Sequence, residues 1–338
     1  MSTLEQLRQF TTIVSDTADF EKLGHYQPQD GTTNPSHILN AVKLQKYTQA
    51  ISAAASYGIP QSRDLETRVQ HAILHLIVSF GVEILKRIPG CVSTEVDATY
   101  SFDRDRTIAM AGDVVGLYEK FGVCRDRVLI GITSTWEGLQ ACQVPGQEGI
   151  HCTMTAMFSM VQAKLAAEVE ASVISPFVGR TIDWWQKYFP GKDYTGLKDP
   201  GVQLVTKIFH HYKSLGIKTQ IMAASLRNIG ECVHLAGVDL MTINVGLLEE
   251  LKNADYEVKA RLLVANGELK AHKASPEYLQ DEAKFRLDLF TDVMATEKIN
   301  ESLRIFFNDG EELKKLLRLA IISQIGPGQN GHHKSDLM

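Results

Sequence analysis

Strand-like and helix-like segments alternate along nearly the whole of this 338-residue chain, and this alternation constrains the fold more than any other feature. Short runs typical of strands lie at 10–14, 31–33, 91–96, 128–132, 151–155, 172–176, 219–223 and 239–243. Helical patterns lie between and after them, at 36–57, 65–87, 104–121, 134–142, 157–170, 202–215, 226–236 and 245–251. Strict alternation implies right-handed crossovers and a parallel sheet, and eight such units close most naturally into a (β/α)₈ TIM barrel. The helical stretch from 36 to 87 is an insertion relative to the minimal barrel.

The chain after residue 251 changes character and becomes charged and helical. Helices are predicted at 277–285, 292–307 and 310–322, and we expect these extra helices to wrap the barrel. The last stretch combines Gly, Pro and Asn with the pair His332 and His333, which is typical of a solvated tail. The sequence therefore predicts one domain over 1–325 and a disordered tail over 326–338.

Composition narrows the class of protein. With 44% apolar and 22% charged residues the chain can bury a sizeable core, and a net charge of −5 without a basic cluster argues against a nucleic-acid partner. The N-terminus MSTLEQLRQF has no apolar signal region, and no apolar run approaches the roughly 18 residues of a membrane span. The expectation is a cytoplasmic protein without a membrane partner that acts on a small molecule. Its five cysteines lack CxxC spacing and are expected to be reduced and mostly buried.

Polar side chains follow the carboxyl ends of the predicted strands. These residues are Asp16, Asn34, Glu95, Thr133, Thr155, Ser175, Arg180, Ser225, Arg227 and Asn244. Reactive groups of such barrels project from the carboxyl ends of the strands, so these side chains are expected to meet at one rim.

Two carboxyls and two arginines stand out in this set. Asp16 and Glu95 come from well-separated strands, and two carboxyls sharing a barrel mouth push their proton affinities apart, which suits one as acid and the other as base. The alternative is that each carboxylate caps a loop or pairs with a lysine. Arg180 and Arg227 follow the sixth and seventh strands, where barrels commonly bind phosphate, and the alternative is a surface ion pair for each.

Other polar residues are weaker candidates. His71 and His75 have the spacing of two metal ligands on a helix, but no third ligand follows at motif spacing, so a packed or partly exposed helix is favoured. The pair His210 and His211 indicates an ordinary helix surface. Trp184, with its neighbour at 185, either covers part of the barrel mouth or simply packs, and the sequence leaves both open.

Eight stretches together resemble the transaldolase family, in order and at family spacing, from about residue 4 to about residue 319. They are SDTADF, QPQDGTTNPS, EILKRIPGCVSTEVDA, STWEGLQA, GIHCTMT, ISPFVGR, DPGV and SLRNIGE. The resemblance implies a (β/α)₈ barrel, a cytosolic homodimer without metal or other cofactor, and transfer of a three-carbon dihydroxyacetone unit from a ketose phosphate to an aldose phosphate.

The same resemblance implies roles for individual residues. Asp16 is similar to the family's proton-transfer acid/base, and Glu95 with Thr155 is similar to the pair that holds the catalytic water. The implied substrate and phosphate contacts are Asn34, Thr133, Thr153, Ser175, Phe177, Arg180, Ser225 and Arg227.

The departures from the family lie close to these residues. Gly131 stands where the resemblance places the lysine that forms a Schiff base with the substrate carbonyl, and Thr153 stands where it places an asparagine. Further departures are at Cys91, Ala223 and Leu226, and Val144-Pro145-Gly146 is expected to interrupt the helix after the fourth strand. Replacing lysine by glycine is expected to remove a cation and enlarge the pocket.

Losing the lysine changes the chemistry that is expected. Aldol cleavage needs an electron sink at the carbonyl, which an iminium supplies and glycine cannot. Lys164 and Lys218 are the nearest substitutes by sequence, but they are predicted within a helix and at the opposite end of the barrel.

The sequence therefore predicts a transaldolase-like enzyme that performs acid/base carbonyl chemistry on a small sugar-like metabolite, with or without a phosphate. Condensation, cyclisation, isomerisation and carbon–carbon cleavage all belong to this class. Two alternatives remain: an ordinary pentose-phosphate transaldolase with an inactivating lysine-to-glycine change at 131, and a catalytically silent protein that binds sugar phosphates.

Overall fold

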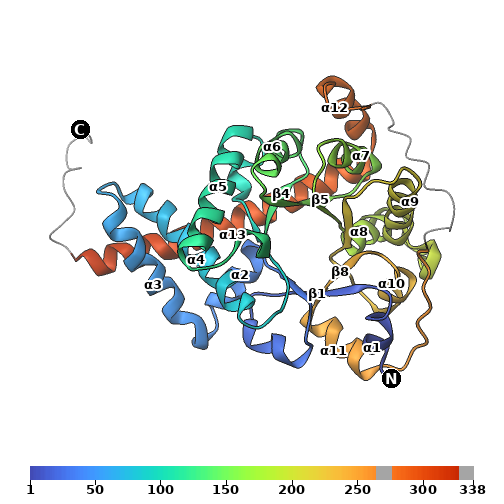
Figure 1. Ribbon diagram of the computed structural model, residues 1–338, viewed down its shortest axis with the longest axis horizontal. Helices are drawn as coiled ribbons and strands as arrows, with labels where there is room; N and C mark the ends of the chain where they lie inside the picture. The colour runs from blue at the N-terminus through green and yellow to red at the C-terminus, as the bar shows by residue number, and fades with distance from the viewer. Residues whose placement is uncertain (264–275, 327–338) are drawn as a thin grey trace.

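Eight parallel strands close into a barrel in the computed structural model, which describes residues 1–263 and 276–326 (Figure 1). The strands are β1 Thr12–Asp16, β2 Asp30–Thr32, β3 Val92–Glu95, β4 Val128–Thr133, β5 His151–Met157, β6 Val173–Pro176, β7 Gln220–Ala223 and β8 Leu240–Asn244. Each strand pairs with the next along the chain, and pairing of Asp16 with Asn244 between β1 and β8 closes the ring. The predicted (β/α)₈ barrel is confirmed.

Helices surround the barrel and extend it on one side (Figure 1). They are α1 Thr3–Leu7, α2 Pro35–Val42, α3 Thr48–Gly58, α4 Leu65–Leu85, α5 Arg104–Lys120, α6 Trp136–Gln147, α7 Met160–Glu168, α8 Val178–Tyr188, α9 Pro200–Ser214, α10 Ile229–His234, α11 Val245–Asn253, α12 Glu282–Thr291 and α13 Val293–Ile325. Short 3₁₀ helices cover Phe20–His25, Gln45–Tyr47, Ile59–Gln61, Ala98–Tyr100, Arg125–Arg127 and Gly196–Lys198. The insertion between β2 and β3 consists of α2, α3 and α4, and α13 packs against all three.

Most of the helices that follow a strand begin with a residue whose side chain caps the helix. The cap residue accepts a hydrogen bond from a backbone N–H of the first helical turn, which satisfies a donor that the helix itself leaves unpaired. Caps of this kind are Asn34 for α2, Thr135 for α6, Ser159 for α7, Asn228 for α10 and Asn244 for α11. The cap fixes where each strand ends and therefore which residues face the rim.

The interior of the barrel is divided into an apolar floor and a polar upper part. Val14, Val173, Met222 and Leu240 form the floor as one buried cluster, with Leu129 packed against it. Alternate residues of a strand point to the same face, so the positions two further along β1 and β8 also point inward. Those positions are Asp16 and Thr242, and the polar site is thus built directly on a packed core.

The predicted strands agree with the observed ones to within about two residues, and β1 differs most. It was expected at 10–14 but begins at Thr12, because Phe10 is 37% exposed and belongs to the turn after α1. All five cysteines are free; Cys142, Cys152 and Cys232 are buried.

Two predicted helix breaks are wrong. The segment 144–146 does not interrupt the helix after β4, since α6 continues through Pro145 to Gln147 and the proline falls in its last turn. The two helices expected at 292–307 and 310–322 are one 33-residue helix, α13, in which Gly310 is buried. Packing of α13 along α2, α3 and α4 outweighs the weak helix propensity of glycine.

Other helix predictions need correction as well. The stretch 36–57 is divided into α2 and α3 by a 3₁₀ turn, and the helix expected at 277–285 is α12, which begins at Glu282. The helix α8 after β6 was not predicted. The helix α4 is long and apolar enough, by length and composition, to cross a membrane, and 56% of the relevant window is buried inside the protein. The prediction of a tail at 326–338 lies outside the described residues except for Gly326.

Candidate active site

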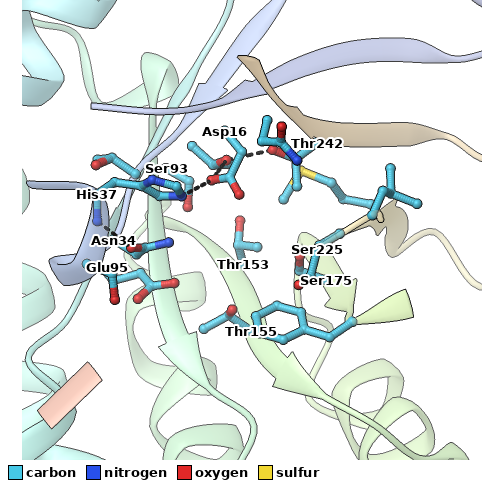
Figure 2. Close-up of a pocket in the computed structure, with 18 of the residues that line it drawn as sticks. Asp16, Asn34, His37, Ser93, Glu95, Thr153, Thr155, Ser175, Ser225 and Thr242 are labelled. Atoms are coloured by element: carbon cyan, nitrogen blue, oxygen red, sulfur yellow. Dashed lines mark hydrogen bonds and ion pairs between the residues drawn. The ribbon is translucent and has the colours of Figure 1, made fainter. Parts of the chain in front are cut away.

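The carboxyl ends of the strands surround a cavity of about 240 Å³ (Figure 2). Most of the predicted site residues line it: Asp16, Asn34, Glu95, Thr153, Thr155, Ser175, Phe177, Arg180, Ser225, Arg227 and Asn244. Gly131 and Thr133 are not among the lining residues. The strand ends therefore bring together two carboxyls, two guanidiniums and several hydroxyls in one cavity.

Asp16, the last residue of β1, is held by two neighbours through the same oxygen. Its Oδ1 accepts a hydrogen bond from Thr32 Oγ1 at 2.9 Å and lies 3.1 Å from His37 Nε2, while the Thr32 hydroxyl in turn contacts Thr242 Oγ1 at 2.6 Å (Figure 2). Burial alone would raise the pKa of Asp16, but the charge and hydrogen bond of His37, the hydrogen bond of Thr32 and the charge of Arg180 outweigh it and lower that pKa. Asp16 is therefore an ionised carboxylate at neutral pH.

Glu95, the last residue of β3, has the opposite protonation state. Burial and the negative charge of Asp16 raise the pKa of Glu95 to about 8, although His37 and Arg180 and hydrogen bonding with Thr155 act in the other direction. No ion pair joins the Glu95 side chain to another described residue. Glu95 is consequently a neutral carboxylic acid at pH 7, able to donate a proton into the cavity.

Glu95 also explains why Gly131 does not line the cavity. The two residues are paired in register on β3 and β4, and a Cβ placed on Gly131 lies only 2.6 Å from Glu95 Cγ and 3.2 Å from Glu95 Cα. The side chain of Glu95 packs over the glycine, so no cavity space opens at Gly131 itself, and the enlargement of the pocket relative to a lysine at 131 stays a prediction. Any larger side chain at 131 requires Glu95 to move.

The threonines of β4 and β5 have different surroundings. Thr133 is buried, and its Oγ1 lies 3.0 Å from Ser101 Oγ, outside the cavity lining. Thr153 lines the cavity, is 2% exposed, and its hydroxyl has no hydrogen-bond partner among the described residues. Thr33, which also lines the cavity, has an equally buried hydroxyl without a described partner, and since an unpaired buried hydroxyl is unfavourable, both threonines gain from a ligand oxygen. The role of Thr133 as a substrate contact stays a prediction.

Arg180 enters the cavity from α8 between two aromatic rings. Its guanidinium lies 5.1 Å from the ring centre of Phe177 and 5.3 Å from that of Phe306, and its Nη1 donates to Ser302 Oγ at 2.8 Å. Burial and the charge of Arg227 lower the pKa of Arg180, which still leaves it charged. Cation–π packing fixes the guanidinium plane and leaves other N–H donors for an anion.

Arg227 is held at the outer edge of the cavity. Its Nη2 and Nε donate to the Asp183 carboxylate at 2.7 and 3.4 Å, and its Nη1 donates to the carbonyl and hydroxyl oxygens of Ser225 at 3.0 and 3.2 Å. Ser225 has a φ of +59°, a left-handed conformation that turns the chain sharply after β7. Arg227 is thus partly neutralised by a surface ion pair, so that Arg180 is the stronger anion-binding group.

No lysine lines the cavity within the described part of the chain. Lys164 donates to Glu277 at 2.7 Å on the outside of the barrel, and Lys218 precedes β7 at the amino end of the strand. Neither lysine is a cavity group, in agreement with the expectation from sequence.

The remaining candidates lie away from the cavity. His75 stacks on Tyr57 with 4.4 Å between ring centres, as a packed helix residue does. The indole of Trp184 donates to Glu297 at 2.8 Å on the surface. His210 is exposed on α9.

Several cavity residues were missed by sequence reasoning. They are Thr32, Thr33, Ser36, His37, Ser93, Met222, Ala224, Thr242 and Phe306. The most consequential is His37, the third residue of α2. The signal that finds His37 is its position in the first turn of a helix that follows β2 at once, the same position that Arg180 has in α8 after β6.

Comparison with known proteins places the chain in a family. The sequence matches the family described as Transaldolase/Fructose-6-phosphate aldolase over residues 13–317. Proteins named transaldolase from Shewanella putrefaciens and from Shewanella sp. (strain W3-18-1) are each 46% identical over 317 residues, which cover 94% of this chain and 98% of the relative. One from Shewanella baltica is 46% identical over 316 residues with the same coverage. This chain therefore belongs to the transaldolase/fructose-6-phosphate aldolase family.

Proposed function

We propose that this transaldolase-family enzyme performs acid/base chemistry on a carbonyl compound that it binds without a covalent imine. The observation that carries the proposal is that two carboxyls share one cavity in opposite protonation states, Asp16 ionised and Glu95 protonated. Gly131, which resembles the position of the Schiff-base lysine, supplies no amine, and no described cavity residue replaces it.

The proposed step is formation of an enediol. Asp16 removes a proton from the carbon next to the carbonyl through Oδ2, the oxygen that no described neighbour occupies, and the C–H electron pair forms the carbon–carbon double bond. Glu95 gives its proton to the carbonyl oxygen, so that one carboxyl gains a proton and the other loses one. Positioned acid/base groups of this kind typically contribute about 10² to 10⁴-fold in rate.

The proposed substrate is a small polyhydroxylated carbonyl compound, with a phosphate near Arg180. The hydroxyls of Thr153, Thr155 and Ser175 offer hydrogen bonds to substrate hydroxyls, and about 240 Å³ suits a sugar-sized molecule. Isomerisation, condensation and cyclisation by intramolecular condensation proceed from such an enediol, and carbon–carbon cleavage, the reverse of condensation, produces one. Action as a cytoplasmic homodimer also stays a prediction.

The test is exchange of α-protons in D₂O, followed by proton NMR with dihydroxyacetone and fructose 6-phosphate as probes. We expect the wild type to exchange α-protons, and Asp16→Asn and Glu95→Gln to lose about 10²-fold or more of that rate. Glu148→Gln, an exposed control on the far side of α6, should leave it unchanged. Unchanged exchange in both site variants, or no exchange by the wild type, refutes the proposal.

A second measurement addresses the covalent alternative. Borohydride reduction in the presence of fructose 6-phosphate is expected to leave the intact mass of the protein unchanged. A mass adduct would reveal an imine on a lysine and return the protein to the standard mechanism of the family.

The second candidate function is binding of a sugar phosphate without turnover. It is favoured by Arg180, whose guanidinium is fixed between two aromatic rings facing the cavity. Calorimetry with fructose 6-phosphate separates the two: tight binding without α-proton exchange supports the binding protein, and exchange supports the enzyme.

A further inference from the structure

His37 occupies an unusual position for a side chain that carries a positive charge. It is the third residue of α2, where its backbone N–H donates to the cap residue Asn34 at 2.9 Å, and its ring lines the cavity (Figure 2). The positive end of the helix dipole disfavours a cation in the first turn, and acidic or amide residues are preferred there. Helix formation therefore gives no reason for a protonated histidine at this place.

A partner for a positive charge on His37 lies across the cavity at the end of β1, where Asp16 is the last residue of the strand. His37 Nε2 lies 3.1 Å from Asp16 Oδ1, and the side chain of His37 is 29% exposed. Burial by itself would lower the pKa of His37, but the charge and hydrogen bond of Asp16 raise it above its ordinary value. Asp16 therefore favours the protonated form of His37 and opposes the unfavourable effect of the helix end.

We propose that His37 is a positioning residue that acts through Asp16, supplying the positive partner that no described lysine of the cavity provides. The inference rests on the proposed function, in which Asp16 is the base. His37 and Thr32 both hold Oδ1, so the carboxylate cannot rotate freely and Oδ2 stays directed toward the substrate. The charge of His37 also keeps Asp16 ionised at pH values where a buried aspartate would take up a proton.

The charged groups around His37 decide how it responds to pH. Asp16 on β1 favours the imidazolium and Arg180 on α8 disfavours it, while Glu95 on β3 adds a negative charge only above its pKa of about 8. On the side of α13, Asp309 is hydrogen-bonded to Ser36, the residue before His37. A lysine would stay charged well above neutrality, whereas histidine loses its charge as pH rises through its pKa. Positioning of Asp16 is therefore expected to fail on the alkaline side.

The first arm of the test is NMR titration of the intact protein with ¹³C-labelled histidine and aspartate. In the wild type we expect His37 to titrate above 6.5, and in Asp16→Asn at or below that value. In His37→Gln the pKa of Asp16 should rise by roughly 1 to 3 units, the usual effect of removing an adjacent opposite charge. A pKa of Asp16 unchanged within about 0.3 units, with native circular dichroism, overturns the inference.

The second arm is the pH profile of α-proton exchange in wild type, His37→Gln, His37→Arg and the control His210→Gln, an exposed histidine on α9. His37→Gln should move the acid limb upward by the shift measured for Asp16, His37→Arg should keep the acid limb low, and His210→Gln should match the wild type. A structural role alone would lower the rate at every pH without moving the limb.

The two arms separate the inference from the function on which it rests. If the wild type exchanges α-protons and His37→Gln has an identical profile, the role of His37 is wrong while the function stands. If no probe is exchanged, the proposed function is wrong, and the NMR titration still decides whether His37 sets the charge of Asp16.

Discussion

Replacing Glu95 by glutamine is expected to remove a loss of stability that the wild type suffers at alkaline pH. The pKa of Glu95 is about 8 in the folded protein, against an ordinary value of 4.5. At about 1.4 kcal/mol per unit, this difference corresponds to an upper bound of roughly 5 kcal/mol in the free energy of unfolding. Because the cavity is open to water, we expect about 2 kcal/mol of this to be measured.

The direction in which stability changes with pH follows from whether the folded or the unfolded state holds the Glu95 proton. Between pH 4.5 and about 8 the folded protein keeps the Glu95 proton while the unfolded chain has released it, so the free energy of unfolding falls as pH rises. The contribution of protonated Glu95 to the free energy of unfolding is fully present below pH 4.5 and is lost as the pH rises through about 8. Glutamine cannot ionise. The stability of Glu95→Gln relative to wild type should therefore increase from near zero at acid pH to about 2 kcal/mol near pH 8.5.

Urea denaturation followed by far-UV circular dichroism at pH 5, 6, 7, 8 and 8.5 measures this difference. Glu231, whose pKa burial raises to about 7, titrates in the same window, so the wild-type curve alone does not isolate Glu95. The difference in stability between wild type and Glu95→Gln isolates the contribution of Glu95, and Glu148→Gln serves as the exposed control. A stability difference that is the same at pH 5 and pH 8.5 would refute the reasoning.

Four further substitutions test the packing and charge of the cavity. Gly131→Lys should lower the free energy of unfolding by roughly 1 to 3 kcal/mol, because a Cβ there lies 2.6 Å from Glu95 Cγ; urea denaturation at wild-type strength would show instead that Glu95 moves freely. Arg180→Ala should weaken the binding of fructose 6-phosphate, measured by calorimetry, by roughly tenfold to a hundredfold. Arg227→Ala should weaken the binding less, because Arg227 is already paired with a carboxylate. Equal losses of affinity in the two variants would contradict this prediction. Thr153→Val should leave thermal stability unchanged or raise it by up to about 1 kcal/mol, because its hydroxyl has no described partner; a clear loss of stability would mean that the hydroxyl is bonded after all.

The strands were predictable because strands buried on both faces are apolar over consecutive residues. The run from 128 to 132 was read in this way, and β4 covers Val128–Thr133. Helix boundaries were less predictable, since they depend on partners distant in sequence. Gly310 lies within α13, which packs along the inserted helices, and α6 continues through Pro145 although proline removes one hydrogen bond from the helix.

The carboxyls at the strand ends were predictable, and so was Arg180 in the first turn of α8, whereas His37 in the first turn of α2 was missed. Asp16 and Glu95 are strand ends, and the barrel brings every strand end to one rim. His37 reaches the cavity through the direction in which α2 leaves β2, which sequence does not give. The packing of Glu95 over Gly131 likewise depends on the register of β3 and β4.

The charges of the cavity argue that positions 37, 95 and 131 act as one set. Two nearby carboxyls ionise together only if enough positive charge is close to them. In this cavity His37 allows Asp16 to ionise, and Glu95 stays neutral while its side chain covers Gly131. An ammonium introduced at 131 would favour ionisation of Glu95, and the resulting carboxylate would hold the lysine in its protonated, non-nucleophilic form. We therefore do not expect Gly131→Lys alone to restore the standard transaldolase mechanism. Full transaldolase activity from that single substitution would contradict the roles proposed for His37, Glu95 and Gly131.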